Sequence, residues 1–144
     1  MHIELKRYLS SLGSVVRLAQ AYRDLILLRD TSPERAIRAR NYLGVTLRRF
    51  LNPAGDMLRP SAGLVEDLGD RELSFVIGCE LHLISDAWER YLADWDDARC
   101  LEQFDAFRAK TIEALAQMLD RLDRFRRRLE GAGRPPYFAL PLAA

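Results

Sequence analysis

Apolar side chains recur at alternating intervals of three and four residues along the first part of the chain. Because 3.6 residues make one turn of an α-helix, this spacing places them on one face. The pattern predicts an amphipathic helix over residues 3–28 whose apolar face enters a core. The recurring positions are Leu5, Tyr8, Leu9, Leu12, Val15, Val16, Ala19, Tyr22 and Ile26.

The same periodicity predicts three further helices, over about 31–51, 70–95 and 97–130. The second begins at Thr31-Ser-Pro-Glu34, where we expect Thr31 to be the N-cap and Pro33 to occupy the first turn. The connection between the second and third helices carries prolines and glycines, with one short helical turn expected near residues 64–68.

Helix-capping residues flank the third and fourth helices. Asp70 is expected to cap the third helix, and Asp96 or Asp97 the fourth. Gly131 follows an arginine-rich last turn and is expected to end the fourth helix.

Four long helices without a strand pattern predict an all-α fold, either a four-helix bundle or an irregular helical bundle. The bundle domain is expected to span residues 1–131. Residues 132–144 contain three prolines and predict a non-helical apolar tail.

Composition narrows the functional classes. The chain has 144 residues, a formal charge of +1 and only two cysteines, which do not form a CxxC pair. A net charge this close to zero gives no overall electrostatic attraction to membranes or nucleic acid. Two cysteines at this spacing predict neither a disulfide framework nor a zinc ribbon. No leader sequence and no membrane-spanning run are recognisable, so a cytoplasmic location without membrane contact is expected.

One edge of the third helix carries side chains of types that can bind a metal ion. Cys79, His82, Asp86 and Glu89 share an arc opposite the apolar face. Bundle metal sites need ligands from several inward-facing helices, and no other predicted helix offers a histidine. We therefore interpret these four residues as a solvated helix edge and expect the protein to bind no metal and no cofactor.

Charged residues also occur on predicted apolar faces. Glu80 falls near the centre of the third helix's apolar face, while Arg23 and Arg108 fall on those of the first and fourth helices. A buried carboxylate requires a partner, so the three residues are expected to meet inside the bundle. Such a set is interpreted as a register-fixing network, with a pocket for an anionic ligand or a partner interface as the alternatives.

Catalytic motifs are not recognisable, so no enzymatic activity is expected. The sequence contains no recognisable Ser-His-Asp or Cys-His arrangement. It also has no glycine-rich phosphate loop that precedes a helix. Arginines of the second helix offer a less favoured alternative, a patch for nucleic acid. This patch comprises Arg35, Arg38, Arg48 and Arg49.

The C-terminal tail carries four large apolar side chains that require cover. We expect them to dock on the bundle or on a partner. They are Tyr137, Phe138, Leu140 and Leu142. The sequence therefore favours a non-enzymatic accessory, adaptor or regulatory subunit that binds a protein partner or a second copy of itself. An arginine-using subunit of a nucleoprotein complex is the second reading, and a sensor with an Arg–Glu pocket for an anionic ligand is the third.

Overall fold

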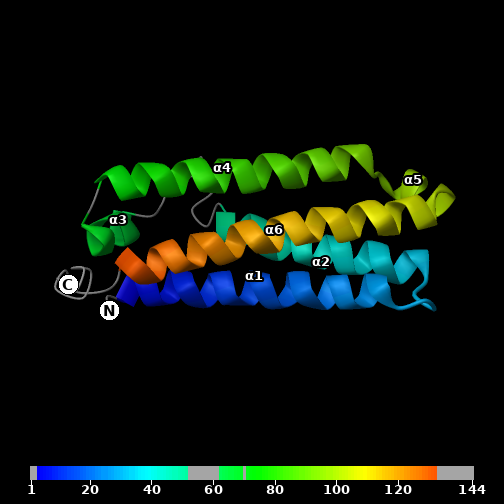
Figure 1. The fold of residues 1–144 in the computed structure, drawn as a ribbon, viewed down its shortest axis with the longest axis horizontal. Helices are drawn as coiled ribbons and strands as arrows, with labels where there is room; N and C mark the ends of the chain where they lie inside the picture. The colour runs from blue at the N-terminus through cyan, green and yellow to red at the C-terminus, as the bar shows by residue number, and fades with distance from the viewer. Residues whose placement is uncertain (1–2, 52–61, 70, 133–144) are drawn as a thin grey trace, which may run out of the picture.

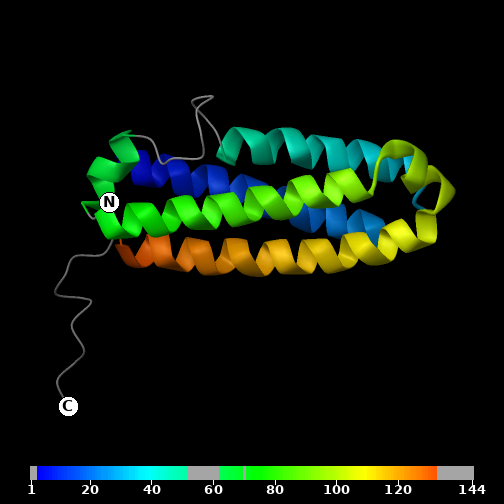
Figure 2. The same ribbon diagram turned by 90° about the horizontal axis from the view of Figure 1, so that it is seen from above.

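The computed structural model describes residues 3–51, 62–69 and 71–132 of the chain. These residues form six helices, with no strand among them, and four of the helices are long. The long helices lie side by side, and successive ones run in opposite directions (Figures 1 and 2). The predicted all-α helical bundle is confirmed. Its helices are α1 (Ile3–Leu27), α2 (Pro33–Leu51), α3 (Ala62–Leu68), α4 (Arg71–Asp94), α5 (Asp97–Glu102) and α6 (Phe104–Ala132).

The core lies between the four long helices. The predicted apolar face of α1 is confirmed, and α1 packs most closely on α2 and α6. The α4 helix closes the bundle through large side chains, including Trp88, Tyr91 and the following Trp95. Phe107 of α6 is fully buried and contacts the rings of Tyr91 and Trp95. Aromatic packing therefore joins α4 to α6 at the end of the bundle near α5 (Figure 1).

The turn between α1 and α2 differs from the prediction. Ser32, not Thr31, is the N-cap, because its Oγ accepts a hydrogen bond from the Arg35 amide at 3.2 Å. Pro33 is the first helical residue. The Thr31 side chain is buried and its Oγ1 donates to the Leu25 carbonyl at 2.6 Å. Thr31 therefore adds a second donor to a carbonyl at the end of α1 that also accepts from the Leu28 amide at 3.2 Å.

The predicted fourth helix is divided in two. Asp96 caps α5, with its carboxylate accepting from the Arg99 amide at 2.8 Å. The chain leaves helical geometry at Gln103 before α6 begins. Gly131 does not end α6, which continues to Ala132.

The short α3 confirms the predicted helical turn near residues 64–68. It closes the end of the bundle where α1 begins (Figures 1 and 2). The carboxylate of Asp67 accepts from the Leu5 amide at 3.0 Å, which satisfies one of the unpaired donors in the first turn of α1. A Cβ on Gly63 would lie 2.7 Å from the Glu4 side chain, so a larger residue at this position would require the Glu4 side chain to move. Asp70, the predicted cap of α4, lies outside the described residues.

Candidate functional site

The structure does not bring Arg23, Glu80 and Arg108 together. The buried face of α4 is centred on Ile77, Leu81 and Ile84, which leaves Glu80 half-buried at its edge. Glu80 instead lines a cavity of about 40 Å³ with Arg124, Phe125 and Arg128 of α6.

The two arginines predicted to meet Glu80 have other partners. Arg23 lies 3.9 Å from the carboxylate of its neighbour Asp24. Arg108 donates to the Leu28 carbonyl at 3.0 Å. Arg108 also precedes Arg124 on α6 by about 24 Å of helix rise, which places it far from Glu80. The predicted three-residue network is therefore wrong, and a ligand pocket built on it is not supported.

A different arginine is buried. Arg40 of α2 is 5% exposed. Its guanidinium donates to the Trp95 carbonyl at 2.8 Å, to the Asn41 side chain at 3.1 Å and to the carboxylate of Asp97. It also donates to the Cys100 sulfur at 3.3 Å. These bonds hold the α4–α5 corner against α2 and keep a buried cation paired, as its burial requires.

Three hydroxyl groups form a second polar set in the core. The Tyr22 and Tyr91 hydroxyls lie 3.0 Å apart, and the Tyr91 hydroxyl lies 2.6 Å from Thr111 Oγ1. This row of hydrogen bonds crosses the bundle from α1 through α4 to α6. A buried hydroxyl without a partner is costly, so this set favours one relative placement of the three helices.

Alkaline pH is expected to destabilise the protein through three tyrosines. Burial raises the pKa of Tyr8, Tyr22 and Tyr91 above the ordinary value near 10. Above that value the unfolded chain releases phenolic protons that the folded chain retains. The free energy of unfolding should therefore fall by about 1.4 kcal/mol per tyrosine for each pH unit above 10.

Urea unfolding across this pH range tests the expectation. Tyr8→Phe is the most informative variant, since the Tyr8 hydroxyl is buried and has no hydrogen-bond partner among the described residues. It should leave stability at neutral pH intact and flatten the alkaline slope. Tyr42→Phe, at an exposed position on α2, serves as the control. If Tyr8→Phe left the pH dependence of the free energy of unfolding unchanged, Tyr8 would not be one of the tyrosines with a raised pKa.

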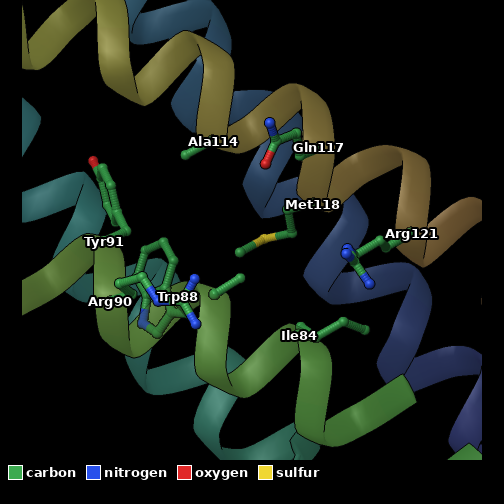
Figure 3. Close-up of a pocket in the computed structure, with 9 residues that line it drawn as sticks. Ile84, Trp88, Arg90, Tyr91, Ala114, Gln117, Met118 and Arg121 are labelled. Atoms are coloured by element: carbon green, nitrogen blue, oxygen red, sulfur yellow. The ribbon is translucent and has the colours of Figure 1, made fainter. Parts of the chain in front are cut away.

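A groove runs between α4 and α6. Its deeper part is a cavity of about 190 Å³ lined by Trp88, Tyr91 and Met118, and the Met118 side chain points into it (Figure 3). The side chains of Arg90 and Arg121 flank it, and neither has an acidic partner in the part of the chain that is described. A shallower hollow of about 290 Å³ continues the groove toward α5. Its margin carries both signs of charge, from Asp94, Arg90, Lys110 and Glu113.

A separate cavity of about 200 Å³ lies between α2 and α4. Arg40, Asn41 and Arg48 supply polar groups to its wall, and the rest is apolar or backbone. Trp88 separates this cavity from the α4–α6 groove, because it lines both. The Trp88 indole nitrogen is buried and has no hydrogen-bond partner among the described residues. The remaining lining residues are Gly44, Val45 and Leu92.

The outer face of α4 carries exposed apolar side chains. Phe75 is 74% exposed and Leu83 is 47% exposed, with exposed Val76 and Cys79 between them. Residues three or four apart are neighbours on a helix surface, so Phe75, Cys79 and Leu83 form one row and Val76 adjoins it beside Cys79. We call these four residues the α4 stripe.

The predicted arginine patch of α2 is on the surface. Arg35, Arg38, Arg48 and Arg49 are all exposed. Arg48 lies 3.9 Å from Glu89, whereas the other three have no ion pair within the described ranges. Exposed Tyr42 and Val45 lie between them at helical spacing.

The remaining predictions concern the possible metal ligands of α4, the C-terminal tail and membrane-spanning segments. Cys79, His82, Asp86 and Glu89 are exposed, and the described residues contain no group of three or more potential metal ligands. The tail residues Tyr137, Phe138, Leu140 and Leu142 lie outside the described residues. Within residues 3–51, 62–69 and 71–132, no helix is both long and apolar enough to cross a bilayer.

Comparison with protein-family models, with curated proteins and with solved structures gives no match for this chain. The functional argument therefore depends on its own surfaces and cavities. The buried Arg40 was missed by the sequence prediction, although its spacing of four from Ala36 and three from Leu43 fits the core face of α2.

Proposed function

We propose that the protein is a non-enzymatic accessory or adaptor subunit that binds a helix of a partner protein on the α4 stripe. The observation that supports this is the set of contiguous apolar side chains that α4 presents away from its core. Apolar side chains scattered singly over a surface need no explanation, but a contiguous group on one helix is typical of a binding site. The cytoplasmic location expected from the sequence is part of this proposal.

The shape of the stripe favours a helical partner. Phe75, Cys79 and Leu83 follow one another at intervals of four residues and form a ridge about 12 Å long. Two helices pack by fitting such a ridge into the groove of the partner. The partner is therefore expected to supply the apolar face of an amphipathic helix, as in other helix-recognition complexes.

The residues that pack α4 into the core are separate from the α4 stripe. Ile77, Leu81 and Ile84 are buried in the bundle on the other side of the helix. A substitution on the α4 stripe is thus expected to change binding without opening the core.

Purification of the native complex tests the proposal with two matched leucines. Leu83 is 47% exposed on the α4 stripe, and Leu101 is 49% exposed on α5, at the end of the bundle away from α3. Leu83→Glu should release the partner, because the added carboxylate would be desolvated in the interface. Leu101→Glu should retain it, and both variants should fold. Equal retention of the partner by both variants would contradict a docking site on α4, and a partner that proves to be a second copy of this chain would identify an oligomer.

A nucleic-acid partner is the second candidate. It is supported by the exposed arginines of α2, which lie on both sides of exposed Tyr42 and Val45 and have few acidic partners. In the same purification, a protein-free sample with a high 260/280 absorbance ratio that high salt abolishes would favour this candidate. An apolar protein partner should instead remain bound in high salt.

A further inference from the structure

We infer that residues 135–142 of the C-terminal tail fold back and bind in the groove between α4 and α6, antiparallel to α6. The inference does not depend on the proposed partner, because no residue of the α4 stripe lines the hollows of this groove. The tail lies outside the described residues, and the groove itself supplies the reasons for this placement.

The groove follows the contact between α4 and α6 over several helical turns. Its deeper cavity and the shallower hollow toward α5 share lining residues on both helices, including Ala87 and Ala114, so the two are continuous. The small cavity beside Glu80 lies one helical turn beyond Ile84, on the side toward α3. The groove therefore leads toward the end of the bundle at which α6 ends, next to α3 (Figures 1 and 2).

The lining of the deeper cavity combines an apolar floor with hydrogen-bond donors at its edge. The Met118 side chain points into the cavity, and Ile84 and Trp88 belong to the same wall (Figure 3). Gln117 and Arg121 lie at the edge, and Arg121 has no acidic partner in the described ranges. This lining suits an occupant that has aliphatic side chains and free carbonyl groups, because arginine and amide N–H groups donate to carbonyls.

The tail has this chemistry. Residues 133–144 contain four large apolar side chains and three prolines, and they contain no aspartate or glutamate. A segment with this proline content favours the polyproline II conformation, in which every backbone carbonyl is free to accept a hydrogen bond. Proline-containing segments bind grooves lined by aromatic side chains in this conformation, and Trp88 and Tyr91 line the α4–α6 groove.

The length of the tail matches the length of the groove. The distance from Arg128 to Ala114 along α6 is about 21 Å by helix rise. Residues 135–142 span about 22 Å at the polyproline II rise. Gly133 and Arg134 remain between the end of α6 and this segment, and glycine permits the reversal of chain direction that the placement requires.

This length fixes the expected register. The two aromatic residues, Tyr137 and Phe138, are placed beside Arg128, whose guanidinium group can stack on an aromatic ring. Leu140 and Leu142 are placed over the deeper cavity, whose volume of about 190 Å³ exceeds the roughly 150 Å³ that holds a benzene molecule. The large apolar side chains of the tail are thereby removed from water without a partner protein.

Photocrosslinking of the full chain tests the location of the tail. The photoreactive residue p-benzoylphenylalanine, placed at position 138 instead of Phe138, inserts on irradiation into C–H bonds of the side chains that it contacts. In an equal mixture of unlabelled and isotopically labelled chains, mass spectrometry separates crosslinks within one chain from crosslinks between two copies. We predict crosslinks within one chain, to residues 80–91 of α4 or 114–128 of α6.

Two exposed alanines of α4 provide matched variants. Ala87 lines the groove, whereas Ala93 does not. Ala87→Glu should displace the tail, because a charged side chain then occupies the groove, and Ala93→Glu should not. Chymotrypsin cleavage after Tyr137 or Phe138 reports the change, since a bound segment resists proteolysis. We predict cleavage about tenfold faster in Ala87→Glu than in the unsubstituted chain, and an unchanged rate in Ala93→Glu.

Three outcomes would overturn the inference. Crosslinks could fall outside the groove or fail to form, which would place the tail elsewhere on the bundle or free in solution. Crosslinks could join a labelled chain to an unlabelled one, which would mean that the tail binds a second copy. Chymotrypsin could cleave Ala87→Glu and Ala93→Glu at the same rate, which would show that the groove does not hold the tail.

Discussion

Phe107→Ala is expected to lower the free energy of unfolding by about 3–5 kcal/mol. Phe107 is fully buried and contacts the rings of Tyr91, Trp95 and Phe104. Removing the ring forfeits its transfer free energy and leaves a cavity that rigid helices fill only in part. Urea unfolding followed by far-ultraviolet circular dichroism measures the loss.

Phe75→Ala provides the matched control for this prediction. Phe75 is 74% exposed, so the same chemical change should alter stability by less than about 0.5 kcal/mol. A comparable loss in the two variants would mean that Phe75 is part of the folding core, and the α4 stripe could not then be a free surface. A loss below about 1 kcal/mol in Phe107→Ala would contradict the packing of α4 against α6.

Arg40→Ala is the second large effect, with an expected loss of about 2–3 kcal/mol. The guanidinium donates to the Trp95 carbonyl, to Asn41 and to Asp97, and its removal leaves the buried Trp95 carbonyl without this donor. The loss is smaller than for a fully buried ion pair, because the Asp97 side chain is 66% exposed and water can solvate it again.

Two further substitutions test why Arg40 is needed. Arg40→Lys should recover only part of the loss, since one ammonium group cannot reproduce the fork of donors that reaches the Trp95 carbonyl, Asn41 and Asp97 together. Arg38→Ala, on the exposed face of the same helix, should change stability by less than about 0.5 kcal/mol. Denaturant midpoints for the three variants give the comparison. Equal stability of Arg40→Ala and Arg38→Ala would show that the α4–α5 corner does not depend on the buried guanidinium.

The sequence predicted the helices because their apolar spacing is regular. On α1 the alternating intervals of three and four residues identify the buried face from Leu5 to Ile26. The break at Gln103 was not predicted, because the apolar pattern continues through it and only the α5 cap reveals the end of that helix. The cap at Ser32 was missed for a related reason, since Thr31 and Ser32 are both suitable N-caps and only their tertiary contacts distinguish them.

Charged positions were harder to place than apolar ones. Glu80 lies within the wide apolar arc of α4, but the true core follows Ile77, Leu81 and Ile84, and Glu80 falls at its margin. Arg40 fits the core spacing of α2, but arginine is rarely buried, so the sequence pattern alone did not identify it as a core residue. The unpaired Trp88 N–H could not be predicted, because hydrogen-bond partners between helices depend on tertiary geometry that the sequence pattern does not contain.

The alkylation rate of Cys79 is the most direct test of the central claim, that a partner helix covers the α4 stripe. Cys79 lies between Phe75 and Leu83 and is exposed. The other cysteine, Cys100, is buried, and burial raises the pKa of its thiol, which keeps it protonated and unreactive. Iodoacetamide therefore reports on Cys79 alone in the folded chain.

The measurement compares the isolated chain with the native complex by mass spectrometry. We predict rapid alkylation of Cys79 in the isolated chain and at least about tenfold slower alkylation in the complex, with the rapid rate restored in Leu83→Glu. Protection already present in the isolated chain would mean that another segment of the chain covers the stripe. A stable complex in which Cys79 reacts as fast as in the isolated chain would contradict the proposal.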